Sequence, residues 1–297
     1  MNVNKPLNIN DVDLLANGQQ SVLPLSQQTD MSYFLQRIHL AEISRNIVDR
    51  INSDPSNRHT HIMKMDRELF GMMQEIPAFL QLDNYSDITD CNSKPNNLFI
   101  QAYFLNTLLH TQRCKLHLNT LTRTPTTSPT YASSHAAYIH SAHQLLHIET
   151  ILLRSQHPFA HRPQRPPAGL YSIFIATIAL LIDACLNRLN TLQDELRRGD
   201  LAEGLQMIAD SREDSLAAAK LYESLMHIAG RYGDTQHSGE KNLNELDNLT
   251  TAVTRPDLLS DALREQQPSS SQINDAIHLN LVEWDDLFSS VSSSPFF

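Results

Sequence analysis

Apolar residues recur at intervals of three and four positions as far as residue 228, and this spacing limits the fold more than any other feature of the sequence. Six segments carry it, at about residues 30–53, 62–76, 98–121, 133–154, 170–188 and 217–228. None shows the sustained alternation of a strand, and only 8 glycines and 14 prolines stand among 297 residues to interrupt helices. The spacing predicts an all-α fold, an irregular multi-helix bundle.

Two of these segments predict where the core lies. In the first, the residues expected to face inward are Phe34, Ile38, Ala41, Val48 and Ile51. The stretch from Leu170 to Ile182 is 13 residues long and apolar on nearly all sides, well short of the roughly 20 residues that a membrane span needs. We therefore expect residues 170–186 to form a buried central helix rather than a membrane segment.

Composition divides the chain into four parts. Residues 1–30 are predicted to be an extended leader, residues 31–233 a helical domain, residues 234–272 a polar linker and residues 273–297 an acidic-aromatic tail. Helical signals in the linker are weak, so the C-terminal part is expected to be loosely ordered.

The tail carries one further stripe of apolar and aromatic residues at helical spacing. Its members are Ile273, Ile277, Leu281, Trp284 and Phe288. Acidic residues between them would keep such a helix in water until it meets an apolar groove. We predict that Ile277, Leu281, Trp284 and Phe288 dock on a partner such as a coactivator. The alternative is that the stripe packs back on the bundle with Trp284 as its anchor.

Chemistry-bearing side chains concentrate in the segment 133–154. His140, His143 and His147 have a spacing that could gather imidazoles for a metal, but a helical projection turns them away from the apolar face. No cysteine or acidic residue joins them in that sector, so a solvated polar face is the preferred interpretation. Glu149 projects into the apolar face, where a carboxylate needs a partner. We expect a salt bridge or hydrogen bond that fixes helix packing there.

Signatures of catalysis and of phosphate binding are missing from the sequence. It has no G-x-S-x-G elbow, no phosphate-binding glycine loop and no H-E-x-x-H, and its 3 cysteines are too scattered for a zinc site. A short, proline-broken basic cluster is interpreted as a solvated loop; it comprises Arg154, His157, His161, Arg162 and Arg165. The 23 basic and 33 acidic residues give a net charge of −10, which disfavours direct DNA binding.

Several blocks, in order, resemble a known family. They are PLNINDVDL at 6–14, TDMSYFLQRIHLAEISRNIVDRI at 29–51, MDRELFGMMQEIPAFLQL at 65–82, YFLNTLLHTQRCKLHLNTLTR at 103–123, SPTYASSHAAYIHSAHQLLHIE at 128–149 and LYSIFIATIALLIDACLN at 170–187. Together they cover roughly residues 5–235 and resemble the middle homology region of fungal binuclear zinc cluster transcription factors, the fungal-specific transcription factor domain. The departures are LHLNTL at 116–121, which lacks a proline frequent in the family, and Tyr138, which stands where cysteine is frequent.

The resemblance implies a nuclear regulatory module that restrains or transmits activity and is not an enzyme. Its partners would be a coactivator or other regulator subunits, with a homodimer left open. The family's six-cysteine zinc cluster and basic linker have no counterpart in this sequence. The chain is therefore expected to be truncated, to hold no cofactor of its own, and to reach DNA only through a missing N-terminal domain or a partner.

Two alternatives stay open at the level of sequence. The first is a helical small-molecule-binding protein or enzyme that uses Glu149, Asp183 and His117 in a cavity between helices. The second is an inert fragment whose exposed core faces make it aggregate.

Overall fold

The computed structural model describes residues 4–10, 12, 22–53, 57–85, 96–123, 128–155, 157–160, 167–186, 192–213, 218–223 and 225–226. Its long helices are α2 (Ser32–Ser53), α3 (Arg58–Gln74), α4 (Asn96–Arg123), α5 (Pro129–Arg154), α6 (Pro167–Leu186) and α7 (Leu192–Ser211). The 3-10 helices η2 (Ala78–Leu80) and η3 (Leu82–Tyr85) follow α3, and η5 (Pro158–Ala160) follows α5. No strand occurs in these ranges, and the predicted all-α fold is confirmed.

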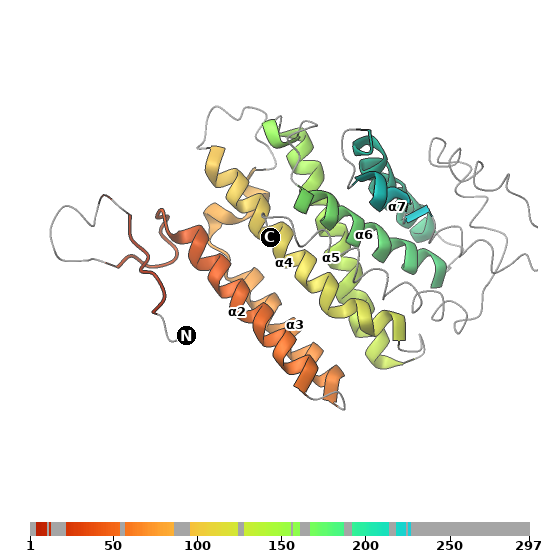
Figure 1. The fold of residues 1–297 in the computed structure, drawn as a ribbon, viewed down its shortest axis with the longest axis horizontal. Coiled ribbons are helices and arrows are strands. Elements are labelled where there is room, and N and C mark those ends of the chain that lie inside the picture. The colour runs from red at the N-terminus through yellow and green to blue at the C-terminus, as the bar shows by residue number, and fades with distance from the viewer. Residues whose placement is uncertain are drawn as a thin grey trace, which may run out of the picture.

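The long helices follow one another across the molecule in chain order (Figure 1). Helices α2 and α3 lie side by side at one end and both contact α4. Helices α4, α5 and α6 contact one another pairwise, and α7 packs on α6 at the other end. The short helices η2 and η3 contact α4, so residues 78–85 lie against the bundle.

Helix α6 is buried on every side that the structure describes. All residues from Gly169 to Leu181 are buried, and Ile173, Phe174, Ile175 and Ala176 are each 0% exposed. These residues join parts of α4, α5 and α7 in the largest apolar cluster. The predicted central helix is thus confirmed, because an all-round apolar helix is stable only where other helices surround it. No helix in the described ranges has the length and apolar character to span a membrane.

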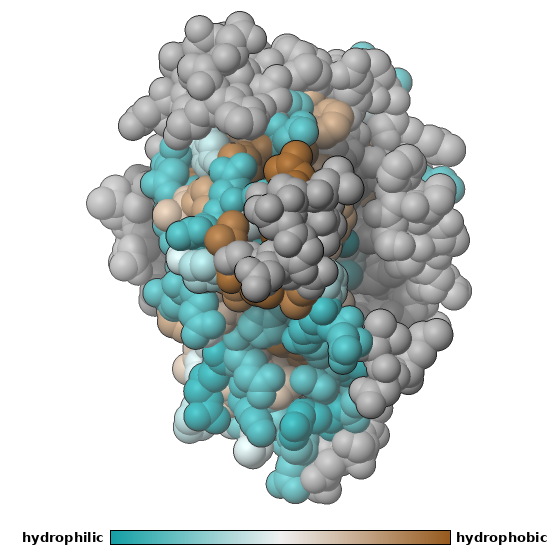
Figure 2. Space-filling view, turned by 90° about the vertical axis from the view of Figure 1, so that its left-hand side faces the viewer, coloured by the Kyte–Doolittle hydropathy of each residue, from teal (hydrophilic) through white to brown (hydrophobic). Residues whose placement is uncertain are grey.

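Helix α2 buries a face that is turned away from most of the predicted one, and of the predicted residues Ile51 packs half-buried against the core. Phe34 and Val48 are 53% and 54% exposed, whereas Leu40 and Ile43 are 6% and 4% exposed. The helix carries two apolar stripes, each with helical spacing, and contact with α3 and α4 decides which stripe is covered. Figure 2, which faces this end of the molecule, shows hydrophobic residues exposed among hydrophilic ones.

Helix α7 is an element that the periodicity did not predict. Its sequence is rich in charge and holds Gly199 and Gly204, which weaken both the apolar pattern and the helix propensity. Leu201 and Ile208 are nevertheless 1% and 0% exposed, because they pack against the apolar surface of α6. Of the next predicted segment, Leu221 and Leu225 are buried as expected, whereas the flanking positions lie outside the described residues.

The described part of the leader is tied to the start of α2 through one buried amide. Asn8 is 4% exposed, and its Nδ2 donates to the carbonyl oxygens of Leu23 (3.1 Å) and Pro24 (3.0 Å). Its Oδ1 accepts from Thr29 Oγ1 at 2.6 Å, and Thr29 Oγ1 in turn accepts from the N–H of Met31 at 3.2 Å. Residues 4–10 and 22–31 are thereby held together where α2 begins.

Candidate functional site

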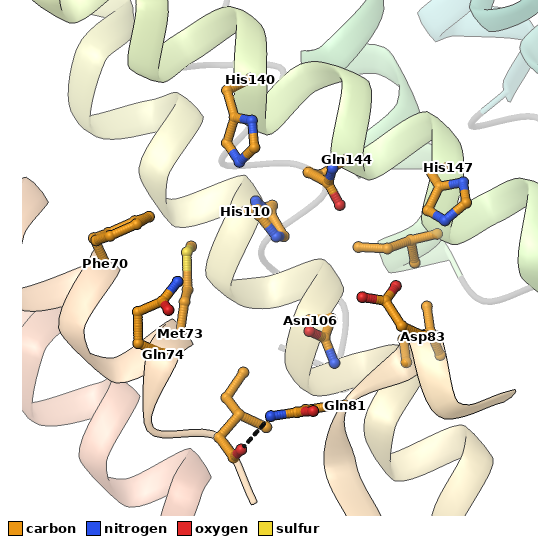
Figure 3. Close-up of a pocket in the computed structure, with 13 residues that line it drawn as sticks. Phe70, Met73, Gln74, Gln81, Asp83, Asn106, His110, His140, Gln144 and His147 are labelled. Atoms are coloured by element: carbon orange, nitrogen blue, oxygen red, sulfur yellow. Dashed lines mark hydrogen bonds between the residues drawn. The ribbon is translucent and has the colours of Figure 1, made fainter. Parts of the chain in front are cut away.

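A pocket of about 350 Å³ lies between α3, residues 76–83 that follow it, α4 and α5 (Figure 3). Polar side chains predominate in its lining and come from all of these segments, whereas the apolar lining comes from α3, residues 76–82 and Ile148 of α5. The lining residues are Phe70, Met73, Gln74, Ile76, Gln81, Leu82, Asp83, Asn106, His110, His140, Gln144, His147 and Ile148. A volume of this size falls in the range of pockets that hold small molecules.

Two amides of the lining hold the chain that leads from α3 into η3. Gln81 Nε2 donates to the carbonyl oxygen of Ile76 at 3.0 Å, the bond drawn in Figure 3. Asn106 Nδ2 donates to the carbonyl oxygens of Leu80 (3.0 Å) and Ala102 (2.8 Å). These side chains fix the pocket wall, because each satisfies a backbone carbonyl outside regular helix pairing.

His110 is the buried polar group of the pocket. It is 9% exposed, and its Nδ1 has no hydrogen-bond partner within the described residues. Burial, followed by the neighbouring His140 and Arg113, lowers the pKa of His110 to about 3. The pKa of His140 is also lowered, first by burial and then by Arg113 and His143. Both imidazoles are therefore neutral near neutral pH.

A buried ion-pair network stands beside the pocket and joins α3 to α4. Arg113 donates two hydrogen bonds to Asp66, from Nε to Oδ1 at 2.6 Å and from Nη2 to Oδ2 at 3.0 Å. His117 Nε2 lies 3.0 Å from the same Oδ1. Burial alone would raise the pKa of Asp66, but the hydrogen bonds with His117 and Arg113 outweigh it and hold the pKa well below its ordinary value. The Arg113 guanidinium also lies 5.3 Å from the centroid of the Phe70 ring, a pocket-lining residue.

The predicted polar face of α5 is confirmed. His140 and His147 are exposed, and His143 is half-buried, with Nδ1 2.9 Å from Asp200 Oδ2 on α7. None of the described residues forms a group of three or more histidine, cysteine or acidic side chains placed to hold a metal ion.

The partner predicted for Glu149 is Tyr103. Glu149 is 1% exposed, and its Oε1 accepts a hydrogen bond of 2.6 Å from Tyr103 Oη, which joins α5 to α4. The prediction of a buried, satisfied carboxylate is confirmed.

One member of the predicted solvated basic loop is buried instead. His157 is 7% exposed, its Nδ1 accepts from the N–H of Phe159 at 3.2 Å, and its ring packs beside those of Phe99 and Phe159. An imidazole can close a turn through its own nitrogen while its ring contributes apolar area, which explains the difference. Arg154 is exposed as predicted, and His161, Arg162 and Arg165 lie outside the described residues.

The structure does not bring Glu149, Asp183 and His117 together in one cavity, as the alternative interpretation of the sequence required. Asp183 pairs with His135 at 2.5 Å, and His117 pairs with Asp66. His135 precedes Glu149 by 14 positions on α5, about 21 Å along the helix axis, so Asp183 and Glu149 serve distant contacts. The tail residues Ile277, Leu281, Trp284 and Phe288 lie outside the described residues, and their docking stays a prediction.

Sequence reasoning did not find His110, Asp66 or Arg113. His110 stands directly after Leu109 in an apolar stretch of α4, and a polar residue on a largely buried helix is the signal that could have marked it. Asp66 and Arg113 lie 47 positions apart, and nothing in the sequence links them.

The chain has relatives among known proteins. No family model matches it, and no solved structure matches it. A probable transcription factor named lepB from Aspergillus flavus is 28% identical over 238 residues, which are 78% of this chain and 42% of that protein. The agnestins biosynthesis cluster transcription factor AgnL11 of Paecilomyces divaricatus is 24% identical over 275 residues, 91% of this chain and 38% of its own length.

A third relative carries the zinc cluster in its name. It is the Zn(2)-C6 fungal-type transcription factor mpsB of Macrophomina phaseolina, 27% identical over 135 residues, which are 46% of this chain and 18% of that protein. The chain thus spans about two fifths of the length of the first two relatives: 42% of lepB and 38% of AgnL11. The resemblance found in the sequence is confirmed: the relatives of this chain are fungal transcription factors.

Proposed function

We propose that this chain is a regulatory module of a fungal transcription regulator and acts in the nucleus. The observation that carries the proposal is the alignment of 78% and 91% of the chain with fungal transcription factors. A bundle of helices around α6, whose residues 169–181 are all buried, suits a module that transmits a signal through packing.

The proposed module does not catalyse a reaction and holds no cofactor of its own. Zinc would belong to a separate DNA-binding region, supplied by more of the same protein or by a partner. Its partners would be a coactivator or other regulator subunits. The acidity of the chain supports this division, since a net charge of −10 repels the phosphate backbone of DNA.

The proposed contact with a coactivator is the stripe formed by Ile277, Leu281, Trp284 and Phe288. Such acidic, aromatic segments fold when their apolar face enters a partner's groove.

A reporter assay tests the module as a whole. The full chain is fused to a heterologous DNA-binding domain, and reporter output is compared with that of the DNA-binding domain alone. Output should change, upward or downward, and an Ile178→Asp fusion that unfolds the bundle should lose the part of the effect that the bundle provides. Output indistinguishable from the DNA-binding domain alone, with the fusion expressed and nuclear, would exclude the regulatory role.

The tail is tested in the same fusion. Trp284→Ala with Phe288→Ala in the full chain should reduce activation, because both anchors of the docking face are removed. Replacement of two serines of the same tail, Ser290→Ala and Ser292→Ala, is the matched control and should leave output unchanged, because neither belongs to the apolar and aromatic stripe. Equal activation by the aromatic double variant and the parent would refute the docking role.

A further inference from the structure

Helix α2 carries an apolar stripe on its outer side, away from the core of the bundle. Phe34, Ala41 and Val48 follow one another at intervals of seven positions and are all exposed, Phe34 and Val48 by more than half. Seven residues make nearly two turns, so the three side chains lie within about 40° of one another around the helix. Leu40 and Ile43 turn instead into the apolar cluster shared with α3 and α4. We call Phe34, Ala41 and Val48 the α2 stripe.

The end of the bundle that carries the α2 stripe is basic, although the chain as a whole is acidic. Helices α2 and α3 together hold six basic and four acidic residues. Arg37 and Arg45 stand beside the stripe, three or four positions from its members, and Arg45 pairs with Asp49 at 3.1 Å. At the other end of the bundle, α7 holds two basic and five acidic residues. An acidic partner is therefore attracted to α2 and repelled by α7.

The C-terminal part of the chain has the complementary features. Residues 227–297 hold four basic and eleven acidic residues, and no basic residue follows Arg264. The apolar and aromatic stripe of the tail, from Ile273 to Phe288, would extend over about 22 Å as a helix. The α2 stripe extends over about 21 Å from Phe34 to Val48. The two stripes thus match in length, and the charges of their surroundings are opposite.

The chain between the bundle and the tail is long enough to bring the two stripes together. Residues 227–272 separate the last described residue, Met226, from the tail, and these 46 residues reach up to about 150 Å when extended. A domain of this size is only about 45 Å across. A tether of this kind gives the tail an effective concentration on the order of mM at any site it reaches. A weak contact with α2 would therefore be formed most of the time.

We propose that the α2 stripe binds the tail of the same chain, with the apolar and aromatic face of residues 273–288 against Phe34, Ala41 and Val48. The acidic residues of the tail then lie in the field of Arg37 and Arg45. The same face of the tail is the one proposed to dock on a coactivator, so the two contacts exclude each other and a coactivator must displace the tail from α2. This regulatory meaning rests on the proposed function, whereas the contact itself is tested on the purified chain and can fail independently.

Fluorescence of the full chain tests the contact, because Trp284 is its single tryptophan and lies in the tail. The emission maximum of the folded chain should lie well to the blue of the maximum in concentrated urea, since the indole leaves water for an apolar surface. The maximum should not depend on protein concentration, because both partners belong to one chain. Emission equal to that of the urea-unfolded chain would overturn the proposal. A blue shift that disappears on dilution would also overturn it and would assign the stripe to a second copy.

Two variants of α2 assign the contact to the stripe. Val48→Glu removes an apolar contact and presents a like charge to the tail, so the emission of Trp284 should shift toward that of the unfolded chain. Asn46→Glu, at an exposed position on another side of α2, is the matched control and should leave the emission unchanged. A blue-shifted emission that Val48→Glu does not move would place Trp284 elsewhere and overturn the proposal. If Val48→Glu loses the helical circular dichroism of the parent, Phe34→Glu at the other end of the stripe decides by the same criterion.

Discussion

Gly169, near the start of α6, lies where any side chain would collide with the Tyr103–Glu149 hydrogen bond. A Cβ at this position would meet Tyr103 Oη at 2.5 Å and Glu149 Oε1 at 2.9 Å. Gly169→Ala should therefore destabilise the protein by about 1–3 kcal/mol, measured by urea unfolding. Gly71→Ala in α3 is the matched control, because a Cβ there meets nothing within 4 Å. It should be neutral or stabilising by up to about 1 kcal/mol, and equal losses in both variants would contradict the packing argument.

Asp66 neutralises the buried Arg113, so its removal should cost far more than loss of a surface ion pair. Asp66→Asn leaves a guanidinium that is 7% exposed without its counter-charge, at a cost of about 3–5 kcal/mol. The comparison is Asp49→Asn, whose carboxylate pairs with Arg45 at 3.1 Å on the surface of α2. That change should cost less than about 1 kcal/mol. Urea unfolding at neutral pH measures both, and similar losses would refute the special role of Asp66.

The same carboxyl predicts a pH dependence. The pKa of Asp66 is held below its ordinary value of 3.8 in the folded state, so the unfolded chain binds its proton more readily. The stabilisation is therefore complete above about pH 4 and is lost as the pH falls toward the folded-state pKa. The stability gap between the parent and Asp66→Asn should narrow steadily between pH 4 and pH 2 in urea unfolding. If the difference in free energy of unfolding between the two proteins stays constant over this range, the ionised Asp66 is not the source of that difference.

At the scale of the element, α6 is the helix on which the bundle depends. Ile178 is 1% exposed, and Ile178→Asp places a charge without a partner among apolar side chains. We expect a loss of several kcal/mol and an unfolded or markedly less stable protein. Leu153→Asp on α5 is the control, because Leu153 is 42% exposed and its replacement remains in water. Circular dichroism and thermal melting of Ile178→Asp that match the parent would contradict the central position of α6.

Helices α2 and α7 show how an element depends on its neighbours. On α2 the apolar stripe that contains Phe34 and Val48 stays exposed while Leu40 and Ile43 are buried. Periodicity predicts that this segment forms a helix, but it cannot tell which of two similarly apolar stripes will be buried. Contact of α2 with α3 and α4 decides which stripe is covered. On α7 a weak pattern still forms a helix because α6 offers it an apolar surface.

At the scale of the whole molecule, charge predicts how the chain behaves toward DNA. With a net charge of −10, the purified chain should give no sequence-selective footprint at physiological salt in the absence of partners. The control is the same chain fused to a basic DNA-binding domain, which should protect that domain's site. A selective footprint from the chain alone would place a DNA-reading surface within it.

The sequence by itself determined the all-α class, the buried α6, the outward histidines of α5 and the buried state of Glu149. These follow from hydrophobic periodicity along single helices, which is a local property. Tertiary structure alone decided that Tyr103 satisfies Glu149, that Arg113 meets Asp66 across 47 positions, and that His110 lines a pocket. Each of these pairs side chains from different helices, so each depends on how the helices pack. Packing is set by the summed burial of all the helices together, and no single segment of the sequence encodes it.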